Sequence, residues 1–259
     1  MMQSLPSLPP LLEGERLDEV NEQLRLIQKN KGLTFGTDAY LLAAYVKSAP
    51  SSVAVELGGG TGIISLLLAA KRKLRCITAV EIQPEYAELI QRNVTLNGHD
   101  EQIRVLCKDV RELKPADVGS EVDLVFSNPP YMRTDSGKRN TEDEKYIARH
   151  EVCGGIDDFC ASAARLLRYG GKFVCVWRPD RLSELFSALH AHSLEPKRMT
   201  MVHADLASEP CMVLLESIKG GAPSMRISPP LILYREKKKG ECRRELTDRA
   251  KMIYDTCSF

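Results

Sequence analysis

Short apolar, β-branched runs alternate with longer segments of helical periodicity along most of the chain. Seven runs of the first kind are evident, at residues 52–57, 75–81, 103–107, 122–127, 172–177, 197–203 and 211–218. Segments typical of helices lie at residues 62–70, 84–97, 156–167 and 181–192. Strand–helix alternation of this kind predicts an α/β fold, with a doubly wound, mostly parallel seven-stranded sheet of the Rossmann-like type and helices on both faces.

The last two runs lack a helix between them. Only residues 204–210 separate them, and a parallel pair needs a longer crossover connection. We therefore expect a hairpin, with the final strand antiparallel at or near the edge of the sheet.

The N-terminal 50 residues are predicted to form a short extension of hairpin and helix in front of this domain. Residues 1–12 are proline-rich and predict a loose arm. Residues 24–28 alternate like a strand, and the turn at 30–32 can return the chain to residues 33–35 as a hairpin. Thr37 or Asp38 is the expected N-cap of an apolar helix over 39–46.

A basic tail is expected after the main domain, which we place at residues 51–234. Residues 235–259 include Lys237, Lys238 and Lys239 in succession, followed by Arg243 and Arg244. Such a tail is either a solvated, partly helical surface segment or an electrostatic contact to RNA phosphates.

Composition indicates a soluble globular protein, with 43% hydrophobic and 27% charged residues and a net charge of +1. The chain has eight cysteines, none in a C-x-x-C spacing, which favours small buried side chains over a metal site and suits a reducing cytoplasm. No basic, apolar leader opens the sequence, and no apolar run approaches the ~20 residues of a membrane span. We expect a cytoplasmic protein without membrane contact.

A glycine cluster follows the first strand of the predicted domain. Glu56 precedes Gly58, Gly60 and Gly62 in an E-x-G-x-G-x-G pattern at a strand-to-helix turn. Glycines there let a nucleotide ligand approach the backbone at the carboxyl ends of the strands. The dinucleotide pattern G-x-G-x-x-G is absent because Ile63 stands where its last glycine would be, and no P-loop pattern occurs. A tight structural turn is the simpler alternative. An acidic residue beside the glycines favours S-adenosylmethionine, whose amino-acid end is cationic and which has no phosphate.

Acidic residues also follow the next two strands. Glu81 ends the second strand, where a carboxylate can accept hydrogen bonds from two ribose hydroxyls. Asp109 follows the third strand, where it can accept from the amino group of the cofactor adenine. Each has a plain alternative, a helix cap for Glu81 and an ordinary loop residue for Asp109, but the three strand ends together indicate one cofactor site.

The fourth strand leads into Asn128-Pro129-Pro130-Tyr131. Two prolines alone would make a rigid turn. The exocyclic amino group of adenine is a poor nucleophile because its lone pair is delocalised, and hydrogen-bond acceptors aimed at its N–H bonds free that pair. The Asn128 side-chain oxygen and the Pro129 carbonyl can be those acceptors, and Tyr131 can stack on the base. The polar residues 132–150 that follow are either a lid that orders on substrate binding or an unstructured insertion.

These motifs resemble the class I amino-methyltransferases with an N-P-P-Y motif. With Phe35-Gly36-Thr37-Asp38-Ala39 and other short stretches over residues 13–234, the chain is more closely similar to the tRNA1(Val) adenine-37 N6-methyltransferase family. The resemblance implies cofactor contacts at Glu56, Gly58, Glu81 and Asp109 and target contacts at Asn128 and Tyr131. It also implies that Asp38 and Phe35 line the mouth of the active site, where Asp38 is expected to contact the cofactor.

The predicted function is transfer of a methyl group from S-adenosylmethionine to an exocyclic amino nitrogen, with adenine N6 in tRNA as the expected target and tRNA as the partner. A protein glutamine-N5 methyltransferase uses the same motif on an amide, but would favour a helical N-terminal domain of about 70 residues that this chain lacks. An rRNA guanine-N2 methyltransferase is a third possibility. A non-catalytic RNA-binding module is disfavoured by the intact cofactor and acceptor motifs.

Overall fold

The computed structural model describes residues 10–31, 36–130, 154–236 and 244–259. Its strands are β1 (Glu15–Asn21), β2 (Leu24–Lys29), β3 (Val53–Leu57), β4 (Cys76–Glu81), β5 (Ile103–Cys107), β6 (Val122–Ser127), β7 (Leu167–Trp177), β8 (Leu194–His203), β9 (Pro210–Lys219), β10 (Arg226–Ile227) and β11 (Leu231–Ile232). Its α-helices are α1 (Thr37–Tyr45), α2 (Ile63–Ala70), α3 (Pro84–Leu96), α5 (Ile156–Leu166), α6 (Leu182–Ala191) and α7 (Asp248–Thr256). Three short 3-10 turns lie at Val110–Glu112, Pro115–Val118 and Pro179–Arg181.

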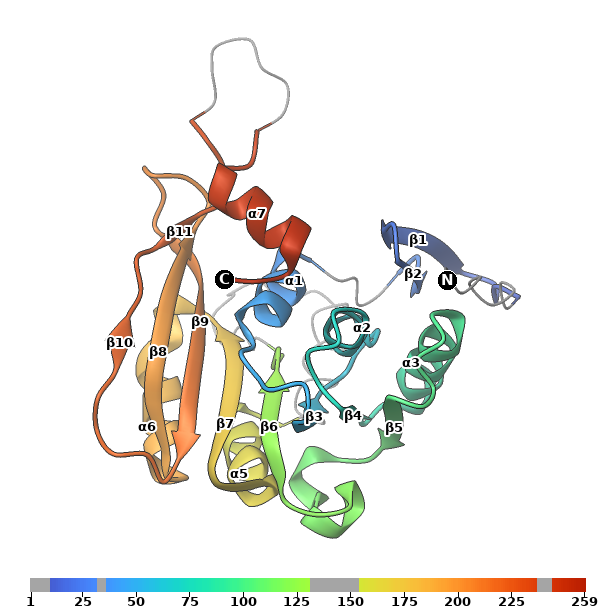
Figure 1. Cartoon of the computed structure of the whole chain (residues 1–259), viewed down its shortest axis with the longest axis horizontal. Helices are drawn as coiled ribbons and strands as arrows, with labels where there is room; N and C mark the ends of the chain where they lie inside the picture. The colour runs from blue at the N-terminus through green and yellow to red at the C-terminus, as the bar shows by residue number, and fades with distance from the viewer. Residues whose placement is uncertain (1–9, 32–35, 131–153, 237–243) are drawn as a thin grey trace, which may run out of the picture.

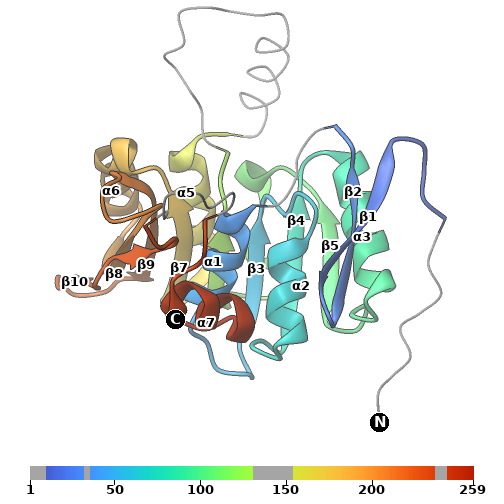
Figure 2. The same ribbon diagram turned by 90° about the horizontal axis from the view of Figure 1, so that it is seen from above.

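One large sheet organises the molecule, as Figures 1 and 2 show. Its strand order is β10-β8-β9-β7-β6-β3-β4-β5, with β11 also paired to β8. Strands β3 to β7 pair in parallel, and β9 runs antiparallel between β7 and β8. The predicted α/β class, the parallel core and the antiparallel final hairpin are confirmed.

All seven predicted strands are present, as β3 to β9, but within the described ranges the sheet has nine strands and the predicted number is too low. The two additional strands, β10 and β11, have two residues each and pair in parallel with β8 at the edge of the sheet. A two-residue strand is too short to show an alternating pattern of apolar and polar positions.

Helices cover both faces of the sheet (Figure 2). Alternate residues of one strand point to opposite faces, and β7 shows this clearly. Val174 and Val176 belong to the core shared with α1, α2 and α7, whereas Phe173, Cys175 and Trp177 belong to the core shared with α5 and α6. Burial on both faces explains why the central strands are continuously apolar in sequence.

The N-terminal hairpin differs from the prediction. Strand β2 pairs antiparallel with β1, which precedes it, while residues 33–35, the predicted partner, lie outside the described residues. The sequence of β1, Glu-Arg-Leu-Asp-Glu-Val-Asn, is dominated by polar residues that are half-buried or exposed in the structure. Its pattern therefore carries little of the apolar signal by which a strand is recognised.

Asn93 of α3 and Asn97, the C-cap of that helix, hold the free edge of this hairpin. Asn97 accepts from the backbone N–H of Arg25 at 3.0 Å and donates to its carbonyl at 2.7 Å. Asn93 makes the same pair of contacts with Ile27, at 2.7 and 3.0 Å. The two side-chain amides thus satisfy backbone groups of β2 as a neighbouring strand would. They hold the hairpin against α3.

Helix α1 begins without the predicted side-chain cap. Its N-cap is Gly36, with no capping hydrogen bond from a side chain, and Thr37 and Asp38 lie in the first turn instead. All seven residues from Ala39 to Tyr45 are buried. Within the described ranges no helix is long and apolar enough to cross a membrane.

The described part of the C-terminal segment packs on α1 through α7, and Figure 1 shows the two helices side by side. Ala250, Ile253 and Cys257 are buried in the core that α1 and α2 share. Two arginines of this segment are paired, Arg235 with Asp248 at 2.5 Å and Arg244 with Asp205 at 3.0 Å. Residues 237–243, with the three consecutive lysines, lie outside the described residues, and a contact to RNA phosphates stays a prediction.

Candidate active site

The predicted cofactor residues meet where β3 and β4 end. The backbone N–H groups of Gly58 and Gly59 both donate to the carbonyl of Val80, each at 2.9 Å. Gly58, Gly60 and Gly62 have left-handed backbone conformations, with φ of +73°, +57° and +80°. At Gly62, which begins α2, a Cβ atom would also lie 2.9 Å from Cγ2 of Ile90. The turn therefore needs glycine both for its backbone angles and for close packing on α3.

Glu81 joins the glycine turn to the end of β4. One carboxylate oxygen accepts from the Gly60 backbone N–H at 2.9 Å and the other from the Gln83 N–H at 3.0 Å. Only 4% of the residue is exposed. Because carboxylate oxygens have further lone pairs, the same group can still accept hydrogen bonds from a ribose lying across the strand ends, as the sequence predicts.

Glu56 lies under the turn and is fully buried. The Ser65 hydroxyl of α2 donates to its Oε2, whereas Oε1 has no hydrogen-bond partner in the part of the chain that the structure describes. Burial raises the pKa of Glu56 to about 8, against the opposing effect of the Ser65 hydrogen bond. A buried carboxylate with an unpaired oxygen is costly unless a cation or donor reaches it.

These features fit a cofactor with a cationic amino-acid end and a nucleoside. Glu56 could receive the positive charge, the glycine turn leaves room for the ligand backbone to approach, and Glu81 could hold the ribose. Asp109 is a less open candidate, because Arg111 contacts its carboxylate through the backbone N–H at 2.9 Å and through the guanidinium at 2.5 Å. These hydrogen bonds lower the pKa of Asp109, and its predicted contact to the cofactor adenine stays a prediction.

The acceptor side is built around Asn128, which follows β6. Its side-chain nitrogen donates to Oδ2 of Asp38 at 2.7 Å. A carboxylate can only accept, so the amide atom facing Asp38 must be the nitrogen. The oxygen of Asn128 is then the atom that faces away from Asp38. Asp38 thus contacts the acceptor motif in this structure, and its predicted contact with the cofactor stays a prediction.

A hydrogen bond joins the ends of β3 and β6, directly before the glycine turn and the Asn-Pro-Pro segment. The Ser127 hydroxyl donates to the carbonyl of Leu57 at 2.6 Å, and both residues are buried. Pro129 is buried as well, and it has no N–H to satisfy. The remaining residues predicted for the acceptor side lie outside the described residues. They are Tyr131, Phe35 and residues 132–150.

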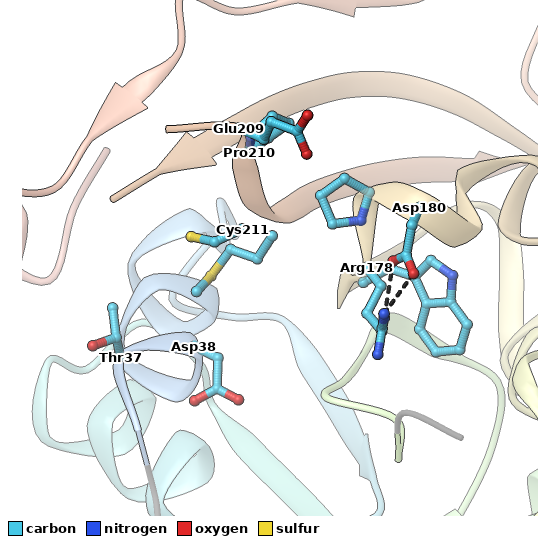
Figure 3. A pocket seen from close by; sticks show the side chains of 10 residues that line it. Thr37, Asp38, Arg178, Asp180, Glu209, Pro210 and Cys211 are labelled. Atoms are coloured by element: carbon cyan, nitrogen blue, oxygen red, sulfur yellow. Dashed lines mark hydrogen bonds and ion pairs between the residues drawn. The ribbon is translucent and has the colours of Figure 1, made fainter. Parts of the chain in front are cut away.

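An open cavity of about 650 Å³ adjoins Asp38. Figure 3 shows Thr37 and Asp38 from α1 on one side of it, Arg178 and Asp180 on another, and Glu209, Pro210 and Cys211 above. A cavity of this size takes a small ligand or one nucleotide of a larger one. Asp38 lines this cavity and also contacts Asn128, so a group of the substrate could approach Asn128 from the cavity.

Three features of the candidate site were not predicted from the sequence. Ser65 orients Glu56, Asn93 donates to the Thr61 carbonyl at 3.0 Å and so links the hairpin to the glycine turn, and Arg178 lines the cavity. Asn93 in the last turn of α3 and Asn97 at its C-cap are four residues apart, and this spacing was the available signal, since it places two polar groups on the same side as the buried face of the helix.

Comparison with known proteins agrees with this geometry. The chain is 31% identical over 194 residues to a tRNA1(Val) (adenine(37)-N6)-methyltransferase of Phocaeicola vulgatus, a match that covers 75% of this chain and 80% of the relative. It is 27% identical to a protein of the same name from Porphyromonas gingivalis, over 73% of this chain and 76% of the relative.

Solved structures show the same fold. A predicted O-methyltransferase of Agrobacterium tumefaciens superimposes with a TM-score of 0.67 at 22% identity, covering 86% of this chain and 97% of the other. The family described as methyltransferase small domain matches residues 30–191. Strand order, glycine turn and Asn-Pro-Pro segment therefore have one common explanation: the chain is a methyltransferase and belongs to the methyltransferase small domain family.

Proposed function

We propose that the protein uses S-adenosylmethionine to methylate the exocyclic N6 of an adenine in tRNA. The observation that carries the proposal is the contact between Asp38 and the Asn128 amide, because it turns a hydrogen-bond acceptor toward an incoming amino group beside the cofactor turn. The names of the similar proteins from Phocaeicola vulgatus and Porphyromonas gingivalis support adenine in tRNA as the target.

The residues of this chain would act by binding and orientation. When bound, S-adenosylmethionine supplies an electrophilic methyl group. Glu56 and Glu81 would hold the two ends of the cofactor, and the Asn128 oxygen and Pro129 carbonyl would accept from the two N–H bonds of the target amine. Held in this way, the amine would keep its lone pair directed at that methyl group, and after transfer it would release its proton to solvent. No strong base is needed, so alignment contributes most of the acceleration.

The base must leave its stack to reach this site, since the acceptor motif lies at the ends of the strands and not on a flat surface. The cavity beside Asp38 offers room for such a base or its neighbour. Glutamine amides and the N2 of guanine present the same kind of amino group, and the experiment below separates these targets.

The test is to incubate the purified protein with methyl-labelled cofactor and total RNA from a strain that lacks the gene. We expect label in tRNA, recovered as N6-methyladenosine by nucleoside mass spectrometry. RNA from the parent strain is the matched control, because its target should already carry the methyl group. Label in N2-methylguanosine of rRNA, or in a protein fraction, would replace the proposed target with one of the other two.

A further inference from the structure

Helix α7 is fixed at both ends. At its start the Thr247 hydroxyl accepts from the Ala250 N–H at 3.2 Å and donates to the Ile232 carbonyl at 2.7 Å. At its end the Lys73 ammonium donates to the carbonyl of Cys257 at 2.6 Å and to that of Ala43, in α1, at 3.1 Å. These contacts join the last helix of the chain to α1 and make the pair a single packed unit.

Tyr254 is the residue of α7 that contacts the first turn of α1. Its ring lies on Tyr40, with 5.2 Å between the ring centroids, and its hydroxyl group hydrogen-bonds to the Thr37 side chain. Tyr40 in turn accepts a hydrogen bond from Asn21 of the hairpin at 3.2 Å. Thr37 and Tyr40 are therefore held from outside the helix, and Asp38 lies between them.

The first turn of α1 needs such support. Its N-cap is a glycine, and no side chain caps the helix. The Ala39 N–H donates to Oδ1 of Asp38 at 2.9 Å, but a helix end without a capping residue still leaves N–H groups of its first turn without intrahelical partners and frays more easily. Asp38 lies in this turn, and its Oδ2 accepts from the Asn128 side-chain nitrogen at 2.7 Å, so a shift of the turn would move a partner of the Asn128 amide.

We propose that Tyr254 is a positioning residue for methyl transfer: by holding Thr37 and Tyr40, it keeps Asp38 in place to orient the Asn128 amide. The inference rests on the proposed function, since it assumes that Asn128 faces the acceptor. The contacts of Tyr254 described above are to α1, whereas the glycine turn and Glu81 follow β3 and end β4, so its effect should fall on turnover and not on cofactor affinity.

The experiment compares Tyr254→Ala and Tyr254→Phe with Met252→Ala, a control on the exposed side of the same helix. We expect Tyr254→Ala to lower kcat about tenfold to a hundredfold, because misplacing an orienting group by an ångström has effects of this size. Tyr254→Phe keeps the ring contact and loses the Thr37 hydrogen bond, so its loss should be smaller. Cofactor Kd, measured by calorimetry, should stay within about twofold in all three variants, as expected for a distant site.

A double-mutant cycle with Asp38→Ala separates positioning from general destabilisation. If Tyr254 acts through Asp38, Tyr254→Ala should change the residual rate of the Asp38→Ala enzyme by no more than about twofold. Unchanged kcat in Tyr254→Ala, or rate losses that multiply in the double variant, would overturn the inference. If Tyr254→Ala does not fold, a kcat of Tyr254→Phe equal to that of the unsubstituted protein would overturn it as well. Failure of the proposed function is distinguishable, because the unsubstituted protein would then transfer no methyl group to RNA.

Discussion

The cofactor side and the acceptor side of this active site are stabilised in different ways. On the cofactor side, the backbone N–H groups of Gly58 and Gly59 donate to the Val80 carbonyl, and the Gly60 N–H donates to the Glu81 carboxylate, all between the ends of two adjacent strands. On the acceptor side, Asn128 depends on Asp38, a residue 90 positions earlier in the chain. The first site is a property of local sequence, whereas the second is assembled from distant segments.

This difference leads us to expect different responses to substitution. Changes on the cofactor side should alter affinity for S-adenosylmethionine, because the groups concerned contact or shape the space for the ligand. Changes on the acceptor side should alter turnover, since they affect an alignment that matters only when methyl group and nitrogen meet.

The largest effect is expected for Asn128→Ala. Removing an oriented acceptor from the reacting nitrogen should lower kcat by about 10²–10³, the range found when one preorganised hydrogen-bonding group is lost. Cofactor binding measured by calorimetry should stay nearly normal, because Asn128 lies outside the glycine turn. Turnover equal to that of the unsubstituted enzyme would remove Asn128 from the proposed mechanism.

An exchange of the two side chains provides the control. Asn128→Asp alone places two carboxylates against each other, and their repulsion should abolish the contact. Asp38→Asn combined with Asn128→Asp restores one donor and one acceptor with their positions reversed. We expect the double variant to recover a large part of the activity that Asn128→Asp loses.

A smaller effect is expected for Glu81→Ala, and it should appear in the cofactor Kd. The substitution leaves ribose donors and the Gly60 N–H without their acceptor, so binding should weaken by ~1–3 kcal/mol. Glu81→Gln keeps an acceptor oxygen, so its cofactor Kd should lie between those of the unsubstituted protein and Glu81→Ala. A Kd unaltered by Glu81→Ala would show that the ribose is held elsewhere.

The sequence predicted where Glu56, the glycines and Glu81 lie in the fold because their signals are local, while their contacts with a cofactor stay a prediction. Glu56, the glycines and Glu81 are each recognised from a few neighbouring residues, and all lie at the ends of adjacent strands as expected. The same holds for the large strands, whose apolar runs are unambiguous when both faces of a sheet are buried.

The supports of the acceptor side could not be predicted in the same way. Strand β1 carries little apolar alternation, the N-cap of α1 is a glycine and not Thr37 or Asp38, and Tyr254 lies in a segment whose composition suggested only a basic tail. Strand β1 and Tyr254 are identified only by their contacts with other segments, β2 and Tyr40, and periodicity within one segment does not report such contacts.

The smallest predicted effect concerns protons on the cofactor side. Burial raises the pKa of Glu56 to about 8 in the folded protein without ligand, so at pH 7 the group is mostly protonated. A cationic ligand at its unpaired oxygen would favour the charged form, and binding should then release up to about one proton. Calorimetry at pH 7 in two buffers with different ionisation enthalpies measures the number of protons released, and Glu56→Gln should lower it.

The raised pKa of Glu56 also determines how the stability of the folded protein changes with pH. Because folding raises the pKa, the contribution of Glu56 to stability is greatest below its unfolded value and is lost as pH rises toward 8. Relative to the Glu56→Gln variant, the unsubstituted protein should therefore lose thermal stability between about pH 5 and pH 8. Melting temperatures that change equally with pH in the unsubstituted protein and in Glu56→Gln, together with equal proton release, would show that Glu56 is already charged before the ligand binds.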